Sequence, residues 1–321
     1  MAVYTHVPEA GLRALLSGYD VGALAGFAGI GEGVENTNYL VQTERGKFIL
    51  TLFEKRVREA DLPFFLALMA HLSARGVAAP APIRDRSGSV LKSVCGRPAV
   101  ITSFLPGKTR TKPDPADCRA LGAALAGLHR AGADFPMTRD NALGLHGWRR
   151  LADECVRDAD KCADGLGALI KEEMAFLAAE WPKDLPKGVI HADLFTDNVF
   201  FEGAAVSGFI DFYFSCTDYF AYDLAICIND WSNVGGQWRP ENAAALIEGY
   251  SSVRPLSDAE KKALPIHLRG AALRFLLTRL YDWLHRVDGA MVTVKDPLEY
   301  RDILLRHRRT PLGPPIGAID D

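Results

Sequence analysis

One stretch of the sequence, VIHADLFTDNVFF at residues 189–201, limits what this chain can fold into more than any other. A histidine, two aspartates and an asparagine fall within eight residues, and apolar runs typical of short strands flank them. A turn follows, and a second β-rich run ends in IDF at residues 210–212. Because a hairpin returns the chain close to its start, we expect Asp193, Asn198 and Asp211 to converge at one end of a small sheet.

These three side chains suit metal-dependent phosphoryl transfer. Asp193 can accept a hydroxyl proton, while Asn198 and Asp211 offer an amide and a carboxylate oxygen to a hard cation. The plain alternative is a pair of turns stabilised by the side chains of Asp193 and Asn198. That alternative does not explain a third acid at the end of an apolar strand, so we favour the functional interpretation.

The pattern H-x-D-x-x-x-x-N followed by I-D-F resembles the signature of the aminoglycoside phosphotransferase-like kinases, which are relatives of the protein kinases. The resemblance implies an α+β, two-lobed, protein-kinase-like fold with a small antiparallel β lobe and a larger, mainly α-helical lobe. It implies ATP and Mg²⁺ as cofactors, Asp193 as the catalytic base, and Asn198 and Asp211 as magnesium ligands. His191 and Asp223 would support the catalytic loop, Asp223 by accepting hydrogen bonds from loop N–H groups.

The pattern along the chain agrees with two lobes. Residues 1–104 are typical of hairpins with one helix, residues 105–308 are mostly helical, and residues 309–321 are expected to form a flexible tail. We expect strands at residues 34–43, 47–53, 80–84, 90–94 and 98–104. We expect helices that start at caps Asp61 and Asp114, and helices over residues 166–179, 219–229, 241–250 and 266–286.

The first lobe would hold the nucleotide. The segment GIGEGVENTNY at residues 29–39 precedes a hairpin, where a kinase carries its phosphate-covering loop, and its glycines let backbone N–H groups approach phosphates. Taken alone this is a weak motif, because it reads G-x-G-x-x-N. Residues 101–105 would be the hinge whose backbone binds adenine. The candidate ATP-binding residues are Gly31, Gly33, Asn36, Ser103 and Leu105.

The resemblance fails at one position. The third strand of the family usually carries a Lys or Arg that contacts the α and β phosphates, but Thr51 stands there. The region that usually supplies its acidic partner reads PFF at residues 63–65. The absence of both the basic residue and its acidic partner is consistent, because a buried acid without its partner is costly. Lys47 and Lys55 are possible substitutes, or they are solvated surface lysines.

Three further stretches, residues 141–144, 225–231 and 273–283, resemble segments of the homoserine kinases that share this fold. The resemblance covers about residues 1–308. It implies phosphorylation of the side-chain hydroxyl of L-homoserine to O-phospho-L-homoserine, in threonine biosynthesis. Such a zwitterion needs an acid for its ammonium and an arginine for its carboxylate. The candidates are Asp230 for the ammonium, Trp231 as a pocket wall, and Arg274 or Arg279 for the carboxylate; each could equally make a structural contact.

Three alternatives stay open. The same fold could phosphorylate another small hydroxyl compound, such as choline, methylthioribose or an aminoglycoside. A metal-dependent hydrolase could use His191, Asp193 and Asp211. An inactive kinase-like binding module is suggested only by Thr51.

Composition excludes some partners. The net charge of −3 gives no electrostatic basis for binding nucleic acid or an anionic membrane. No apolar run approaches the roughly 18 residues of a membrane helix, and the first residues do not form a signal-peptide pattern. The six cysteines contain no C-x-x-C pair, and we expect free thiols in a reducing cytoplasm. The oligomeric state does not follow from the sequence.

Overall fold

The computed structural model describes residues 4–31, 36–54, 57–286 and 295–309. The chain divides into two units, and each unit is built from two separate stretches. The first unit comprises Met1–Gly107 with Ser207–Tyr213, and the second comprises Lys108–Val206 with Phe214–Asp321. The first division, after Gly107, lies three residues beyond the boundary expected between residues 104 and 105. The return of Ser207–Tyr213 to the first unit was not predicted, and residues 310–321 of the expected tail lie outside the described residues.

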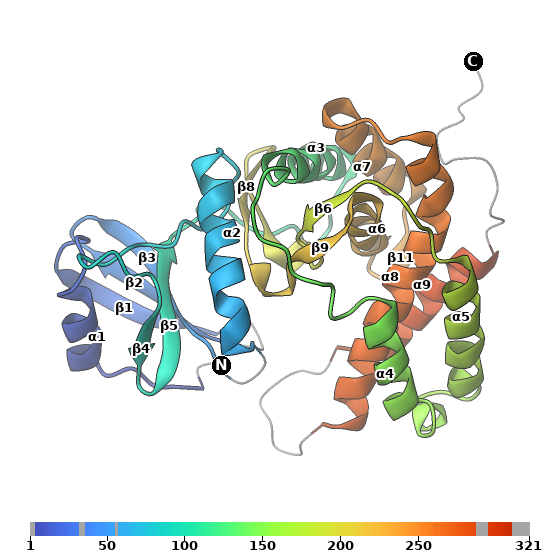
Figure 1. Cartoon of the computed structure of the whole chain (residues 1–321), viewed down its shortest axis with the longest axis horizontal. Coiled ribbons are helices and arrows are strands. Elements are labelled where there is room, and N and C mark those ends of the chain that lie inside the picture. The colour runs from blue at the N-terminus through green and yellow to red at the C-terminus, as the bar shows by residue number, and fades with distance from the viewer. Residues whose placement is uncertain (1–3, 32–35, 55–56, 287–294, 310–321) are drawn as a thin grey trace. The chain divides into compact units, whose positions relative to one another are not determined.

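An antiparallel sheet forms the centre of the first unit (Figure 1), with strand order β1-β2-β3-β5-β4. Its strands are β1 (Leu24–Ile30), β2 (Thr37–Thr43), β3 (Gly46–Leu52), β4 (Lys92–Val94) and β5 (Arg97–Ser103). Alternate residues of β2 and β3, including Tyr39, Val41, Leu50 and Leu52, enter one core with residues of α1 (Glu9–Leu16). Gly46 closes the β2–β3 turn at φ 138°, a conformation that favours glycine.

Two local predictions for the first unit were wrong. Residues 80–84 do not form a strand and make only the isolated bridge Pro82↔Thr102, because prolines in this segment cannot donate to a ladder. The helix α2 (Leu62–Ala74) begins after Asp61, but the side chain of Asp61 does not cap it. That carboxylate instead accepts from Arg58 at 2.9 Å. The strand β1 and the helix α1 were not predicted as elements.

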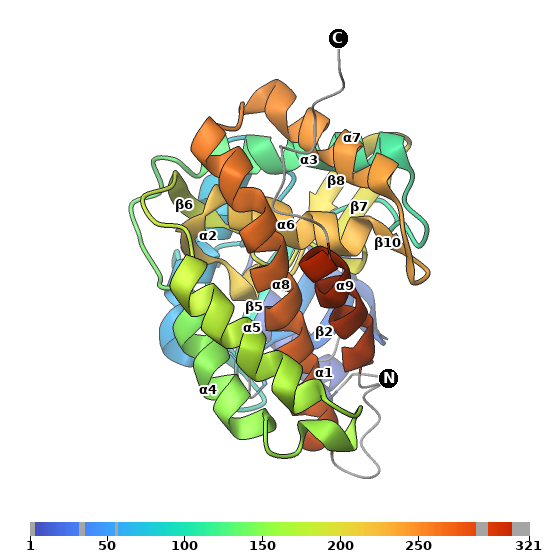
Figure 2. The ribbon, with the colours of Figure 1, turned by 90° about the vertical axis from the view of Figure 1, so that its right-hand side faces the viewer.

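Helices make up most of the second unit. They are α3 (Pro115–Ala131), α4 (Leu145–Cys155), α5 (Leu166–Glu180), α6 (Phe220–Trp231), α7 (Pro240–Val253), α8 (Asp258–Leu284) and α9 (Pro297–Arg309). The long helix α8 packs against α4, α5, α6 and α9, and Figure 2 shows it between α5 and α9. The helices α3 and α7 pack on each other. No helix among the described residues is both long and apolar enough to cross a membrane.

Capping explains where two of these helices start. Asp114 accepts from the backbone N–H of Asp117 in a capping box, as the sequence predicts. The helix α8 begins eight residues before the predicted start, because Ser257 and Glu260 form a second capping box and Pro265 is accommodated inside the helix. The helices α4 and α9 were not predicted.

Short strands complete the second unit and carry the polar segment noted in the sequence. The strand β6 (Lys187–Ile190) pairs antiparallel with β9 (Cys216–Tyr219), and β7 (Val199–Glu202) pairs with β8 (Ala205–Phe209), whose residues from Ser207 on belong to the first unit. A small hairpin joins β10 (Asn233–Val234) to β11 (Gln237–Trp238). Residues 191–198, called the polar loop below, connect β6 to β7.

Candidate active site

The polar loop contains a backbone conformation that is uncommon outside glycine. Ala192 has φ 66°, in the left-handed region, which costs a non-glycine residue on the order of 1–2 kcal/mol. The loop ends in a short 3₁₀ turn, Thr196–Asn198, that leads into β7. Unfavourable backbone geometry persists only where surrounding contacts enforce it. Hydrogen bonds from the surrounding residues should therefore hold the backbone of this loop in place.

Asp193 and Asn198 meet inside the loop. The Asn198 Nδ2 donates to the backbone oxygen of Asp193 at 2.8 Å and to its Oδ2 at 3.2 Å. The backbone N–H of Asp193 donates to Nδ1 of His191 at 3.3 Å. With 13% of its surface exposed, the Asp193 side chain remains accessible. The amide orientation that these two bonds require leaves the Asn198 carbonyl oxygen for another ligand.

Asp223, on α6, holds the start of the loop. Its two oxygens accept from the backbone N–H groups of His191 and Ala192, each at 2.8 Å. Nε2 of His129 lies 3.0 Å from Asp223 Oδ2. Burial opposes the charge of Asp223, but the bond with His129 and the loop contacts outweigh it and lower the pKa of this carboxyl. A buried carboxylate of this kind binds N–H groups strongly.

His129 was missed by the sequence analysis, although a signal was present. It follows Leu121 and Leu125 at four-residue spacing on the apolar face of α3, so burial could have been predicted. Its Nδ1 lies 2.8 Å from the hydroxyl of Tyr250 on α7. His129 therefore connects α7 to the acid that supports the polar loop.

The end of α6 holds the second half of the loop. Asp230 accepts from the backbone N–H of Thr196 at 2.8 Å, and Nε1 of Trp231 donates to the backbone oxygen of Leu194 at 2.9 Å. Trp231 is fully buried, whereas Asp230 is half-buried. Burial raises the pKa of Asp230 to about 7, more than the Thr196 bond lowers it. Both residues thus have contacts within the protein.

The two candidate arginines of α8 differ in their partners. Arg274, 1% exposed, donates from Nη1 to the backbone oxygen of Ala192 at 2.6 Å, and its Nη2 lies 4.0 Å from Oδ1 of Asp193. Arg279 donates from Nη1 to Glu299 of α9 at 2.6 Å. Glu299 is therefore the structural ion-pair partner of Arg279 among the described residues.

The first unit contains the remaining candidates. Gly31 follows β1 and is exposed, and Asn36 is buried, with an Oδ1 that has no hydrogen-bond partner among the described residues. The Ser103 hydroxyl accepts from the N–H of Ala81 at 2.9 Å, and Leu105 is half-buried after β5. Gly33 lies outside the described residues, and so does Lys55, one substitute considered for the missing lysine.

Asp211 lies in the stretch that returns to the first unit. It adopts φ 63°, and Tyr213 follows two residues later. The Tyr213 ring packs edge-to-face on Phe53 and Phe65, with centroids 5.0 and 5.8 Å away. Burial raises the pKa of Tyr213, and a hydrogen bond with Thr51 opposes that rise. Thr51, the residue at the usual lysine position, therefore contacts the segment that carries Asp211.

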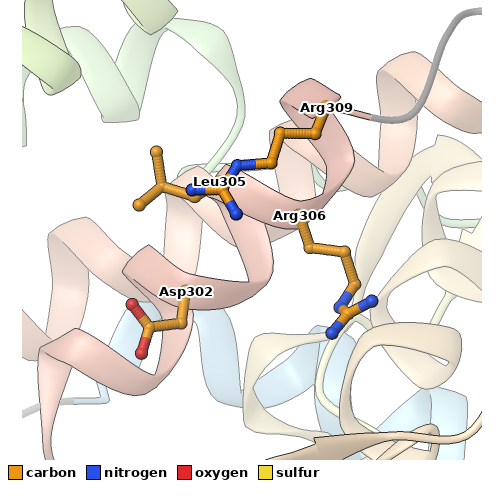
Figure 3. A pocket seen from close by; sticks show the side chains of 4 residues that line it. All are labelled: Asp302, Leu305, Arg306 and Arg309. Carbon is orange, nitrogen blue, oxygen red and sulfur yellow. The ribbon is translucent and has the colours of Figure 1, made fainter.

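A separate pocket of about 380 Å³ lies along α9 (Figure 3). The charged side chains of Asp302, Arg306 and Arg309 line it with Leu305. Arg306 also stacks over the ring of Trp238, 5.6 Å from its centroid. None of the site residues predicted from the sequence lines this pocket.

Relatives of known name cover nearly the whole chain. It is 57% identical over 310 residues to a homoserine kinase of Methylobacterium sp. (strain 4-46), which covers 96% of this chain and 97% of that protein. It is 54% identical over 310 residues to a homoserine kinase of Rhizobium etli, again over 96% of this chain and 97% of the relative.

Solved structures with little sequence similarity share the fold. A spectinomycin phosphotransferase in complex with ADP and spectinomycin superimposes with a TM-score of 0.72 at 14% identity, over 96% of this chain and 100% of that chain. An amicoumacin kinase in complex with AMP-PNP and Ca²⁺ gives a TM-score of 0.70 at 15% identity, over 95% of both chains. These likenesses confirm the expected two-lobed α+β kinase-like fold.

A family model that describes phosphotransferase enzymes matches residues 26–256, a span that includes the polar loop, Asp211 and all of α6. Together with the near full-length relatives, this match settles the family question. The chain belongs to the APH phosphotransferase enzyme family.

Proposed function

We propose that this protein transfers the γ-phosphoryl group of ATP to the side-chain hydroxyl of L-homoserine, giving O-phospho-L-homoserine for threonine biosynthesis. The observation that carries the proposal is the 57% identity, over 96% of the chain, to relatives named homoserine kinase. The geometry of Asp193 and Asn198 supports it, because phosphoryl transfer needs a positioned carboxylate beside a cation ligand.

Asp193 would orient the acceptor hydroxyl. Its side chain is accessible, and Asn198 and the backbone contact to His191 fix its position. A carboxylate that accepts the hydroxyl hydrogen bond places the attacking oxygen in line with the phosphorus. Because little proton transfer is needed early in a loose transition state, this orientation should matter as much as the basicity of Asp193.

The chain's residues suit ATP and magnesium. Similar solved structures contain AMP-PNP or ADP, which supports ATP as the phosphoryl donor. Asn198 and Asp211 would hold Mg²⁺ through an amide oxygen and a carboxylate, the oxygen ligands that this cation takes. The Asn198 amide fits this role, because its NH₂ group already faces Asp193. Bound magnesium would neutralise charge on the transferred phosphoryl group.

In the first unit we keep the nucleotide contacts predicted from the sequence. The residues around β1 and β2 would cover the phosphates, and the segment after β5 would bind adenine through its backbone. The residues concerned are Gly31, Gly33, Asn36, Ser103 and Leu105.

For the amino acid, the contacts in the second unit favour some candidates over others. Asp230 keeps the ammonium role, because it is only half-buried and one N–H is its backbone partner. Arg279 keeps the carboxylate role, since among the described residues its hydrogen bonds, to Glu299 and to the backbone oxygen of Asp296, are both made by Nη1. We propose that Trp231 supports the loop instead of walling the pocket, because it is fully buried and donates to Leu194. Arg274 is treated below.

We also propose that the protein acts in the cytoplasm. Its six cysteines are free, at positions 95, 118, 155, 162, 216 and 227, which suits a reducing compartment. Burial raises the pKa of several of these thiols, including Cys155 and Cys216. Thiols of this kind are unreactive and serve as packing groups.

The test is ADP release by the purified protein with MgATP. Parallel reactions contain L-homoserine, choline, methylthioribose, an aminoglycoside or no acceptor. We expect release that depends on L-homoserine, with O-phospho-L-homoserine identified by mass. ADP release only with another acceptor would show that L-homoserine is not the substrate. Release without any acceptor would indicate hydrolysis, and nucleotide binding without release would indicate an inactive binding module.

A further inference from the structure

Arg274 is a charged side chain in the interior of the second unit. It is 1% exposed, on a helix that packs against four others. Burying a guanidinium is costly unless its N–H groups meet acceptors and its charge meets an opposite charge. The groups around Arg274 should therefore show which part of the protein its charge stabilises.

The partners of Arg274 are in the polar loop. Nη1 donates to the backbone oxygen of Ala192 at 2.6 Å, and Nη2 lies 4.0 Å from the Asp193 carboxylate. The guanidinium also lies over the rings of Phe275 and Phe214, 4.5 and 5.7 Å from their centroids. These rings lie against the ion, and the loop supplies a backbone acceptor and a carboxylate to it.

Arg274 and Asp223 act on the same residue from opposite sides. Asp223 accepts the N–H of Ala192, which belongs to the peptide before that residue. Arg274 donates to the C=O of Ala192, which belongs to the peptide after it. Fixing both peptide planes fixes φ and ψ of Ala192, which is held at φ 66°. The second plane also contains the N–H of Asp193, so its tilt sets the direction of the Asp193 side chain.

We propose that Arg274 is a positioning residue for Asp193 and does not bind the substrate carboxylate. This inference rests on the proposed role of Asp193 in phosphoryl transfer. Arg274 keeps the left-handed Ala192 in place, and with it the direction of the Asp193 side chain. This effect acts on the step in which the acceptor is phosphorylated. A carboxylate clamp would act first on the affinity for the amino acid.

Three variants separate these roles. Arg274→Met keeps much of the volume and removes the donor and the charge. Arg274→Lys keeps the charge and one donor group, and serves as the conservative rescue. Arg279→Gln is the contrasting variant, because this arginine is the proposed ligand of the substrate carboxylate, lies on the same helix and bonds to Glu299 of α9 instead of Ala192.

We expect Arg274→Met to lower kcat about a hundredfold, the scale expected for a displacement of about 1 Å at a reacting group. KM for the acceptor and for ATP should stay within about threefold, because the change removes no contact that binds the ground state and the transition state of the substrate equally. Arg274→Lys should recover part of kcat. An acceptor KM that rises at least about tenfold with kcat retained, in either Arg274 variant, would assign Arg274 to the substrate and overturn the proposal.

A second measurement does not depend on the acceptor. Amide hydrogen exchange of peptides covering residues 191–198 should accelerate in Arg274→Met and stay unchanged in Arg279→Gln, because only the first loses a loop contact. Unchanged exchange in Arg274→Met would overturn the proposal even if the wild-type protein used a different acceptor. Lack of activity with L-homoserine but faster exchange would reject the proposed substrate and retain the role of Arg274. If Arg274→Met does not fold, Arg274→Lys supplies both measurements.

Discussion

The polar loop of the second unit and the contacts around Thr51 in the first unit hold their residues by different means. Acidic and basic side chains from α6 and α8 hold the polar loop, each through a backbone group. Around Thr51 the hydrogen bonds are between neutral groups. Charge-assisted hydrogen bonds are about twice as strong as neutral ones. Removing one hydrogen-bond partner should therefore destabilise the polar loop far more than the Thr51 region.

The Thr51 cluster consists of Asn38, Thr51, Phe65 and Tyr213. The Thr51 hydroxyl donates to Oδ1 of Asn38 at 2.7 Å, and Tyr213 bonds to Thr51 and packs on Phe65. The two places where the sequence departs from the family pattern, Thr51 and residues 63–65, both contact Tyr213 in this way. The structure has a neutral cluster where the resemblance would imply a charged pair, and the residues near Asp211 are held by packing and by hydroxyl groups.

The largest effect should come from Asp193→Asn, which keeps the shape of the side chain and removes its charge. We expect kcat to fall by about a thousandfold or more, within the range that general-base catalysis contributes. Steady-state ADP release measures this. The matched control is Asp197→Asn, because Asp197 belongs to the same loop but has 61% of its side chain exposed. Near-normal turnover in Asp193→Asn would remove this residue from the mechanism.

Asp223→Asn should come next. An amide has one acceptor oxygen, so at least one loop N–H or the His129 contact loses its partner. We expect kcat to fall about a hundredfold through the displaced loop, and the free energy of unfolding to fall by about 3 kcal/mol. Enzyme assays and denaturant titration measure the two effects.

Glu260→Gln is the control for Asp223→Asn. Glu260 is also a buried acid of the second unit, but it caps α8 and pairs with Arg254 at 2.9 Å. Glu260→Gln should lose stability and keep kcat. Equal losses of kcat in the two variants would show that the polar loop is no more sensitive than the rest of the unit.

The free energy of unfolding should depend on pH through a buried histidine of the second unit. His267 on α8 is fully buried, and burial lowers its pKa to about 3. In the unfolded chain a histidine titrates near pH 6.5, so below that pH the unfolded state binds a proton that the folded state does not. The free energy of unfolding should therefore fall by up to about 1.4 kcal/mol per pH unit between about pH 6.5 and pH 3.

Urea unfolding at pH 7, 6 and 5 tests this effect. His267→Phe should reduce the slope, and His285→Phe, at an exposed position, should leave it unchanged. His129 and His307, whose pKa values burial also lowers, contribute in the same direction and belong to the same unit, whereas Asp230, whose pKa burial raises, contributes in the opposite direction. A slope that does not change in His267→Phe would refute the assignment to this residue.

The smallest effect should come from Thr51→Val. The change removes one neutral hydroxyl at nearly constant volume, so we expect a loss of about 1 kcal/mol in the free energy of unfolding. Activity should stay within about threefold, because no charged contact is lost. Thr102→Val, a buried threonine of β5 outside the cluster, is the control. A hundredfold loss of turnover in Thr51→Val would end the distinction between the two regions.

Local chemistry was readable from the sequence, and long-range contacts were not. The spacing of His191, Asp193 and Asn198 predicted residues that the structure brings together, and the Asp114 cap is present. Both depend on residues a few positions apart, so pattern and propensity suffice. The contact between Arg274 and Ala192 joins residues 82 positions apart, and no local pattern encodes it.

Errors in secondary structure have similar physical causes. The helices α1 and α9 owe their stability to tertiary packing that no local pattern displays, and α9 packs on α8. Residues 80–84 looked like a strand because their apolar pattern outweighed two prolines. Asp61 stands at a capping position, but its exposed Arg58 partner competes for the carboxylate.

The stretch Ser207–Tyr213 gives the chain an order of assembly. The first unit includes this stretch, where Ser207 donates to the backbone oxygen of Pro106 and Phe209 to that of Ala78. A ribosome makes the other part of the unit about a hundred residues earlier, and domains generally fold as they emerge. The first unit therefore remains incomplete while about half of the second unit is translated. A fragment ending at Gly107 would lack this stretch, including Asp211, so the two units do not correspond to two consecutive segments of the chain.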